Sequence, residues 1–503
     1  MRHRMWLLGA IVYLCATNIA WIAIDTRPPF WDMANHATWS LGVLRDFQAN
    51  GISALTTLPY ASPGYPPLYY AVVATAYRLL GESIDSAQLA NIPAIILLAL
   101  ATYGTARHLL SPAASVVAAG LVNFYPFMLW ISRETLIETW LTAMVALAIW
   151  TLLQTEEFSR PGWSLAFGIV CGLGMLTKWT FVIFVALPAL WAARKHWRNA
   201  VKAAVVAALL ASYWFIPRFS TLTNSWRQVA AAAPNEGDPT FLSLQAWIFY
   251  IRALEGSLLF LPLFLAFLVG AFIAIRRWNS EWTVLGLSIL GGWIGLLLLP
   301  GSDPRYATGV LPAIAVVSAA AIEKKKAAQV GLAIFLVFQH ALVSFGIPWI
   351  PESVVLMRGT GGPVPYEWNL YTQSYFGLWG KPKNEDWQID HVLQRVAMDP
   401  ARPVRVGLIP DLPRFDQQAF QFAVESKQYP VAVTRQISAE EPSLLQNDYI
   451  LMSAGRQTAF GSPAPHAKEI NAVLLSHGDR FEVIETFHLP NEERILLYRV
   501  RKK

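Results

Sequence analysis

Long apolar stretches follow one another from Trp6 to Ile347, and the pattern changes after that point. The hydrocarbon core of a bilayer requires about 20 apolar residues in each spanning helix. The pattern therefore predicts a polytopic α-helical membrane protein with about eleven transmembrane helices. The predicted spans are residues 5–24, 87–109, 112–131, 136–154, 162–177, 180–193, 200–217, 257–275, 282–299, 306–322 and 327–347.

The segment 66–81 is apolar but short, and it begins with two prolines. Counting it as a span would invert every later span. Cytoplasmic loops of membrane proteins are enriched in Lys and Arg, so the basic clusters that flank the spans should all lie on the cytoplasmic side. They do so only if the segment 66–81 is re-entrant or interfacial. The N-terminus is then cytoplasmic, and the loops 25–86, 132–135, 218–256 and 300–305 face the other side with the tail. The clusters are Arg2/Arg4, Arg107/His108, Arg194/Lys195/Arg198/Lys202, Arg276/Arg277 and Lys324/Lys325/Lys326.

The tail from residue 348 alternates strand-like apolar runs with polar helical ones, which predicts a small α/β domain. We therefore divide the chain into a transmembrane domain, residues 1–347, with an external loop at 25–86, and an extracytoplasmic α/β domain, residues 348–503. The runs are VRVGLIPD at 404–411, DQQAFQFAVESKQ, VAVTR, NDYILMS, a helix near 465–478, FEVIETFHL and ILLYRVR.

Composition agrees with a membrane location. Of the 503 residues, 55% are apolar and 14% are charged, and the mean hydropathy is +0.39. The formal net charge is +6, but most basic residues outside the tail flank spans, so the charge reports topology and does not indicate a nucleic-acid partner. Cys15 and Cys171 both fall inside predicted spans, and no disulfide framework is expected.

The first external loop carries an acid and a histidine at helical spacing. A helical pattern begins near Asp32, which places Asp32 and His36 one turn apart on one face. The alternative role of Asp32 is that of an N-cap, because it precedes a run of helix formers.

Further ionisable residues lie at the external ends of spans. Arg133, Glu134 and Glu138 stand where the third and fourth spans meet, and ionisable groups at such depth usually face a cavity. A salt bridge between Glu138 and Arg133 is the structural alternative for this cluster.

Cations also occur on the external side, where positive charge is disfavoured. Lys178 lies between two apolar runs, Arg305 and Tyr306 begin another, and Arg252 is a weaker member of the group. Snorkelling is the alternative reading of Lys178. Together these candidates supply cations and carboxylates on one membrane face, which suits a lipid phosphate: cations stabilise a leaving phosphate, and a carboxylate accepts the proton of an attacking hydroxyl.

The order of these motifs resembles the GT-C superfamily of membrane glycosyltransferases, in particular the branch with protein O-mannosyltransferases and the lipid A aminoarabinose transferase (glycosyltransferase family 39). An acidic motif follows the first span, and a PPL segment, an SR stretch with an acid, an LTK motif and an RY–LP motif follow in turn. The residues that match are Asp32, Pro66 to Leu68, Ser132, Arg133, Glu138, Leu176 to Lys178, Arg305, Tyr306, Leu311 and Pro312.

The resemblance implies roles for single residues. Asp32 would be the catalytic base, with Glu138 as the second catalytic candidate, and Lys178, Arg305 and Tyr306 would hold the donor phosphate. The chain departs from the family at Met33, where a Glu is usual, and at Tyr65, which replaces a lysine before PPL. His36 would compensate for Met33 or bind a divalent metal as in metal-dependent GT-C enzymes, although one His and one Asp are too few ligands to define a metal site.

By resemblance we expect a multi-pass protein of the bacterial inner (plasma) membrane that takes a sugar from a polyprenyl-phosphate carrier on the extracytoplasmic side, with inversion. The acceptor would be a lipid, a glycan or a protein, and no nucleotide-sugar motif is needed. Two alternatives remain open: a transporter or flippase of lipid-linked sugars, and a polymerase or ligase of surface glycans. Transporters favour polar residues in broken helices at the membrane midplane, whereas this chain concentrates its polar groups at one face.

The assigned topology predicts the behaviour of fusions to alkaline phosphatase, which is active only outside the cytoplasm. A fusion after Lys326 is expected to be inactive and a fusion after Lys503 to be active, because the basic clusters fix the parity of the spans. An inactive fusion after Lys503 at normal expression would contradict the placement of every external candidate residue.

Overall fold

The computed structural model describes residues 2–236, 238–359, 366–375, 377–397, 403–458 and 466–502. These residues form two compact units. Unit 1 comprises Met1–Trp21, Asn50–Val72 and Gln88–Lys381, and unit 2 comprises Ile22–Ala49, Val73–Ala87 and Pro382–Lys503. Residues 25–86 thus contribute to both units, and the domain boundary at residues 347 and 348 stays a prediction.

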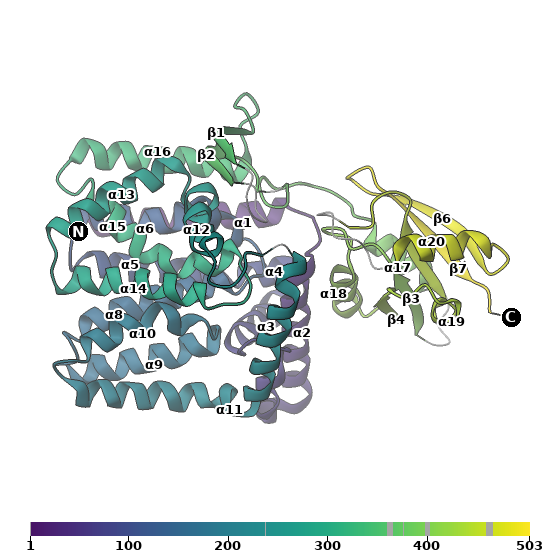
Figure 1. Ribbon diagram of the computed structural model, residues 1–503, viewed down its shortest axis with the longest axis horizontal. Coiled ribbons are helices and arrows are strands. Elements are labelled where there is room, and N and C mark those ends of the chain that lie inside the picture. The colour runs from purple at the N-terminus through teal and green to yellow at the C-terminus, as the bar shows by residue number, and fades with distance from the viewer. Residues whose placement is uncertain are drawn as a thin grey trace. The chain divides into compact units, whose positions relative to one another are not determined.

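Helices make up most of unit 1, and its long helices run side by side (Figure 1). The chain begins with α1 (Arg2–Ile24), and the segments η1 (Gly51–Thr56), η2 (Leu58–Tyr60), α3 (Leu68–Leu80) and α4 (Ile84–Leu89) lie before the main bundle. The bundle continues with α5 (Ile92–Ala106), α6 (Pro112–Phe124), α7 (Pro126–Ile131), α8 (Glu138–Gln154), α9 (Pro161–Thr177), α10 (Phe181–Ala192), α11 (Trp197–Glu236), α12 (Leu244–Ala253), η3 (Leu254–Leu259), α13 (Leu261–Arg276), α14 (Ser280–Leu297), η4 (Pro304–Val310), α15 (Leu311–Ala320) and α16 (Lys326–Phe345).

The helical part is that of a multi-pass membrane protein. Five helical segments of the described residues are long and apolar enough to cross a bilayer, and a sixth crossing results if the bent pair Leu244–Leu259 and Leu261–Arg276 is one span. The shorter α3 has 13 residues, fewer than the about 20 that a crossing requires. The count of eleven spans stays a prediction.

Several of the predicted spans are divided near a proline. Residues 112–131 form α6 and α7 instead of one helix, because Pro126 lacks an N–H and restricts Tyr125 to an extended conformation with ψ 134°. Residues 306–322 divide into η4 and α15, and Pro312 lies in the first turn of α15.

The segment 218–256 was predicted as an external loop, and the structure shows that most of it is helical, whereas the side of the membrane that it faces stays a prediction. Helix α11 continues through Pro217 to Glu236, and α12 follows. The apolar pattern ends near residue 217 because the side chains become polar, whereas the backbone hydrogen bonds that define the helix continue.

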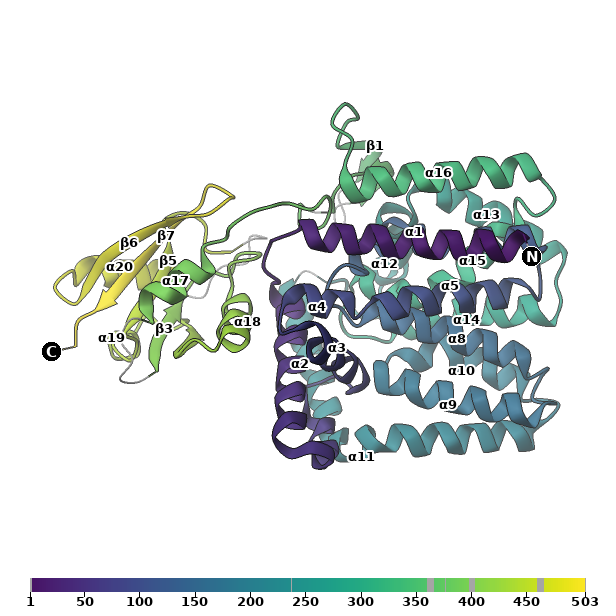
Figure 2. The same cartoon turned by 180° about the vertical axis from the view of Figure 1, so that it is seen from behind.

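Close packing fixes the helices of unit 1 against one another. A Cβ on Gly270 of α13 would lie 2.0 Å from the carbonyl oxygen of Val317 in α15, so only glycine permits this approach. Helices α1 and α16 run side by side (Figure 2), and His340 of α16 contacts Tyr13 and Thr17 of α1 at 3.1 and 3.2 Å. Unit 1 ends with a hairpin of β1 (Ser353–Gly359) and β2 (Tyr366–Thr372), which the sequence analysis did not predict.

Unit 2 contains α2 (Trp31–Asn50) and a mixed five-stranded sheet with the strand order β4-β3-β5-β7-β6. Strands β3, β4 and β5 are parallel, and β7 is antiparallel to both β5 and β6. The elements are α17 (Ile389–Val396), β3 (Val404–Leu408), α18 (Gln417–Lys427), β4 (Val431–Arg435), α19 (Glu441–Leu444), β5 (Tyr449–Ser453), α20 (Ala467–Ser476), β6 (Phe481–His488) and β7 (Arg494–Val500).

Alternating side chains give this sheet two buried faces. Leu451 of β5 and Leu497 of β7 pack in one apolar cluster with α17 and α18. Their neighbours Ile450 and Tyr498 pack in a second cluster with α19 and α20. The two-residue period of the strands thus explains the α/β rhythm that the sequence showed, and the predicted fold class is confirmed.

Candidate functional site

A buried ion pair joins two of the predicted site residues in unit 1. Lys178 Nζ lies 2.8 Å from Glu138 Oε1, and the side chains are 3% and 5% exposed. Glu138 begins α8 and Lys178 directly follows α9. These helices are consecutive and packed together, so the start of one and the end of the other meet. Lys178 has φ −152° and ψ 133°, and this extended residue ends the helix at the pair.

Two tyrosine rings face the same lysine. The ammonium nitrogen of Lys178 lies 4.8 Å from the ring centroid of Tyr306 and 5.8 Å from that of Tyr65. A cation within about 6 Å of an aromatic face is attracted by the ring quadrupole. Glu138, Tyr65 and Tyr306 therefore hold one amine, and Tyr65, which departs from the family motif, belongs to this group.

Arg305 directly precedes Tyr306 in the sequence, and it forms an ion pair with Asp303. Asp303 caps η4 by accepting from the backbone N–H of Arg305, and its second oxygen accepts from Arg305 Nε at 2.8 Å. Arg252, another predicted member, is half-buried in the last turn of α12.

The salt bridge between Arg133 and Glu138 that the sequence left open does not form, because Glu138 pairs with Lys178 instead. Arg133 is buried, donates to Asn18 of α1 at 2.8 Å and to Ser344 of α16 at 2.7 Å, and lies over the ring of Trp21. These contacts make it a link between helices. Glu134 is also buried, and its backbone carbonyl accepts from Asn91.

Glu255 is a candidate that the sequence analysis missed. It is 2% exposed in the π-helical turn η3, and within the described part of the chain both its carboxylate oxygens are buried without a hydrogen-bond partner. The turn precedes a 117° bend before α13. Single carboxylates in apolar segments are costly and usually functional, and the isolated acid in ALEGSLLF was the available signal.

Asp32 and His36 belong to unit 2, on helix α2. Helix α2 begins at Trp31, so Asp32 is in its first turn and His36 follows one turn later on the same face. An acid at this position interacts favourably with the helix dipole. His36 is buried and its ring contacts Trp39 edge to face.

A divalent metal held by Asp32 or His36 was one expectation from the sequence. No group of three His, Cys, Asp or Glu residues among the described residues could hold a metal ion. Asp32 and His36 supply two ligands, which is fewer than the three protein ligands of catalytic metal sites. The residues present therefore do not fit a metal, and no step of the mechanism is assigned to one.

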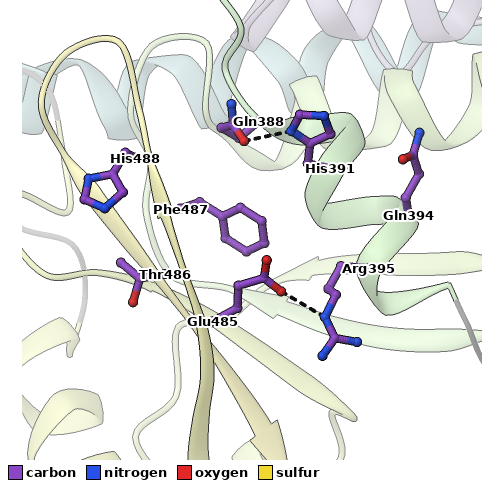
Figure 3. A pocket seen from close by; sticks show the side chains of 8 residues that line it. All are labelled: Gln388, His391, Gln394, Arg395, Glu485, Thr486, Phe487 and His488. Carbon is purple, nitrogen blue, oxygen red and sulfur yellow. Dashed lines mark hydrogen bonds and ion pairs between the residues drawn. The ribbon is translucent and has the colours of Figure 1, made fainter.

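The C-terminal sheet carries an open polar pocket of about 440 Å³ between α17 and β6 (Figure 3). Its single arginine, Arg395, is paired with its single glutamate, Glu485, at 2.8 Å. The lining therefore lacks the unbalanced positive charge that a phosphate requires. The other lining residues are Gln388, His391, Gln394, Thr486, Phe487 and His488.

Comparison with known proteins agrees with the motifs and the fold. Residues 64–227, which include Tyr65, Glu138 and Lys178, match the family model described as dolichyl-phosphate-mannose-protein mannosyltransferase. The crystal structure of ArnT from Cupriavidus metallidurans bound to undecaprenyl phosphate aligns with a TM-score of 0.61 over 98% of both chains, at 12% identity. The chain therefore has the fold of the ArnT structure, and part of its sequence is similar to the mannosyltransferase family.

Two further solved structures share this fold. The oligosaccharyltransferase of Archaeoglobus fulgidus, in complex with Zn and sulfate, aligns with a TM-score of 0.55, 12% identity, and coverage of 98% of this chain and 73% of that chain. The mycobacterial arabinofuranosyltransferase AftD gives a TM-score of 0.51, 14% identity, and coverage of 99% and 40%. No curated protein matches the sequence. The predicted family resemblance is confirmed.

The ion pair predicts a non-additive pattern of stability. Glu138→Gln or Lys178→Met alone leaves one charge buried without its partner, which costs about 3–5 kcal/mol. The double variant removes both charges, so it is expected to recover most of that loss. The measurement is the apparent unfolding temperature of the purified protein in detergent.

A matched control is the exposed pair of Arg160 and Glu156, whose side chains are 49% and 58% exposed. Glu156→Gln is expected to change stability by less than about 1 kcal/mol. If the double variant loses as much as the two single variants together, the buried pair is not coupled and the site geometry is wrong.

Proposed function

We propose that this enzyme transfers a sugar from a polyprenyl-phosphate-linked donor to an acceptor hydroxyl on the extracytoplasmic face of the membrane, with inversion at the anomeric carbon. The observation that carries the proposal is the Lys178 amine, held by Glu138 against Tyr306 and Tyr65. Two comparisons support a lipid-phosphate donor: the family model is named for dolichyl-phosphate-mannose, and the ArnT structure contains undecaprenyl phosphate.

In this proposal Lys178, Arg305 and Tyr306 bind the donor phosphate. An ammonium group has three donors, and one N–H of Lys178 goes to Glu138 at 2.8 Å, which leaves two for phosphate oxygens. Glu138 then has a positioning role, because it fixes the direction of the amine. Asp303 fixes the guanidinium of Arg305 in the same way, and Arg252 adds positive charge.

Asp32 is proposed as the general base of a single displacement. It removes the proton of the acceptor hydroxyl while the hydroxyl oxygen attacks the anomeric carbon. The bond between that carbon and the phosphate oxygen breaks, its electron pair goes to the phosphate, and polyprenyl phosphate leaves. The cations stabilise the charge that develops on the leaving phosphate. His36, one turn from Asp32, is proposed to orient the acceptor.

Asp32→Asn tests the base, since it keeps the shape of the side chain and removes the proton acceptor. Transfer of labelled sugar from a purified polyprenyl-phosphate carrier by the reconstituted enzyme is expected to fall by about 10² to 10⁴, the usual range for loss of a general acid or base. Binding of the carrier should stay close to the wild-type value. Asp46→Asn, on the same helix α2, is the matched control and should leave transfer unchanged.

Each of three results would contradict a part of the proposal. Wild-type rates in Asp32→Asn would remove Asp32 as the base. Movement of the intact lipid-linked sugar across vesicles without cleavage would identify a transporter. Transfer of a whole preassembled glycan in one step would identify a ligase.

A further inference from the structure

The segment between α1 and α2, residues 25–30, is fixed by residues that lie more than 350 positions later in the chain. Thr26 N donates to the carbonyl oxygen of Lys383 at 3.0 Å, and Lys383 N donates to Asp25 Oδ1 at 2.9 Å. Thr26 Oγ1 accepts from Glu385 N at 3.0 Å. Since Asp25 also forms a buried ion pair with Arg27, the start of the segment cannot shift without breaking bonds to the C-terminal part of unit 2.

A second set of contacts holds the end of this segment, next to Asp32. Trp31 Nε1 donates to Asp411 Oδ1 at 2.9 Å. Arg414 donates to the carbonyl oxygen of Pro28 at 2.9 Å, and its guanidinium lies 4.9 Å from the ring centroid of Phe30. We call the loop residues 411–416 that make these contacts the 411–416 clamp.

Asp416 completes the clamp from the start of α18. Its Oδ1 accepts from the N–H groups of Gln418 and Ala419 at 2.9 and 3.0 Å, and Trp31 N approaches the same oxygen at 3.5 Å. Its Oδ2 is buried without a partner among the described residues. Burial raises the pKa of the Asp416 carboxyl to about 7. Burial of a carboxyl group lowers the stability of the folded protein. The presence of Asp416 at this position therefore indicates a role other than stabilising the fold.

The backbone at the clamp is strained. Trp31 has φ +44° and Arg414 has φ +69°, and non-glycine residues in this region cost about 1–3 kcal/mol each and persist only where surrounding contacts hold them. Trp31 is also the first residue of α2, so its conformation sets the direction in which the first turn of α2, with Asp32, begins.

We infer that the 411–416 clamp positions Asp32 for catalysis, which makes the C-terminal sheet domain a working part of the glycosyltransferase. Asp411, Arg414 and Asp416 are positioning residues in this account. The inference rests on the proposed function, in which Asp32 is the base. A second anchor acts at the other end of the helix, where Arg45 pairs with Glu425 at 2.5 Å and with Glu82 at 3.5 Å.

Arg414→Ala removes both the bond to Pro28 and the contact with Phe30, and Trp31→Phe removes the indole N–H that Asp411 accepts while it keeps an aromatic ring. Both variants are expected to lower kcat about 10- to 100-fold, the effect of misplacing a catalytic group by about 1 Å. The KM for the polyprenyl-phosphate sugar should change less than about twofold, because the residues proposed to hold the phosphate belong to unit 1. Arg414→Lys, which retains a donor for Pro28, should recover part of kcat.

Hydrogen–deuterium exchange supplies a readout that does not depend on activity. In Arg414→Ala of the full chain, exchange of peptides covering residues 25–35 should rise, while peptides from α8 and α9 should not change. Arg480→Ala is the matched control, because this arginine of the same domain pairs with Glu441 away from the clamp. It should leave both exchange and kcat unchanged.

A double variant of Asp32 and Arg414 distinguishes a failure of the clamp from a failure of the proposed function. If the clamp acts through Asp32, the double variant Asp32→Asn/Arg414→Ala should turn over no more slowly than Asp32→Asn, because the two residues act as one unit. Unchanged exchange or unchanged kcat in Arg414→Ala, or an additive loss in the double variant, would overturn the clamp. Wild-type activity of Asp32→Asn would instead overturn the assignment of the base.

Discussion

The buried ion pair between Glu138 and Lys178 is the constraint on which the membrane part of the site depends. Two charges taken out of water are costly unless each has its partner, and removal of either partner is more costly still. The pair therefore keeps the start of α8 and the end of α9 in register. It also fixes the amine against the rings of Tyr306 and Tyr65. An amine held in this way can receive a phosphate without first being ordered, which is the benefit of preorganisation.

In unit 2, the proposed base Asp32 directly follows a short irregular segment, residues 25–30. Such segments are mobile unless other parts of the chain hold them. Here the bonds of Thr26 with Lys383 and of Trp31 with Asp411 hold it at both ends. The local strain at Trp31 is then supported by the sheet domain. In the proposed mechanism, phosphate binding thus belongs to rigid helix ends, and proton transfer belongs to a helix start that distant residues hold in place.

The sequence predicted those features that depend on local periodicity. The apolar runs located the helices, and the alternation in the tail located β3, β4, β5, β6 and β7 with the helices α18 and α20. The same reasoning found Lys178 and Arg305, because a cation at an external span end conflicts with the charge pattern of membrane proteins. The match of residues 64–227 to the mannosyltransferase family model supports the order of motifs from which the resemblance was drawn.

Features that depend on tertiary contacts were not predictable in this way. Glu138 was assigned Arg133 as its alternative partner because the two are close in sequence, but packing of α8 against α9 gives it Lys178. Glu255 was overlooked although it is a single acid in an apolar run, because its burial without a partner among the described residues becomes visible only in the structure. The helix α11 extends past its predicted end, since hydropathy marks the apolar part of a helix only. The clamp joins residues more than 350 positions apart, beyond any local signal.

The most direct test of the account is the structure of the enzyme in lipid nanodiscs with a bound polyprenyl phosphate, determined by electron cryo-microscopy. We expect a phosphate oxygen about 2.7–2.9 Å from Lys178 Nζ, the length of a charge-assisted hydrogen bond. The guanidinium of Arg305 should contact the same phosphate, and the bond from Lys178 to Glu138 should be intact. A phosphate bound elsewhere, with Lys178 contacting only Glu138 and the tyrosine rings, would contradict it.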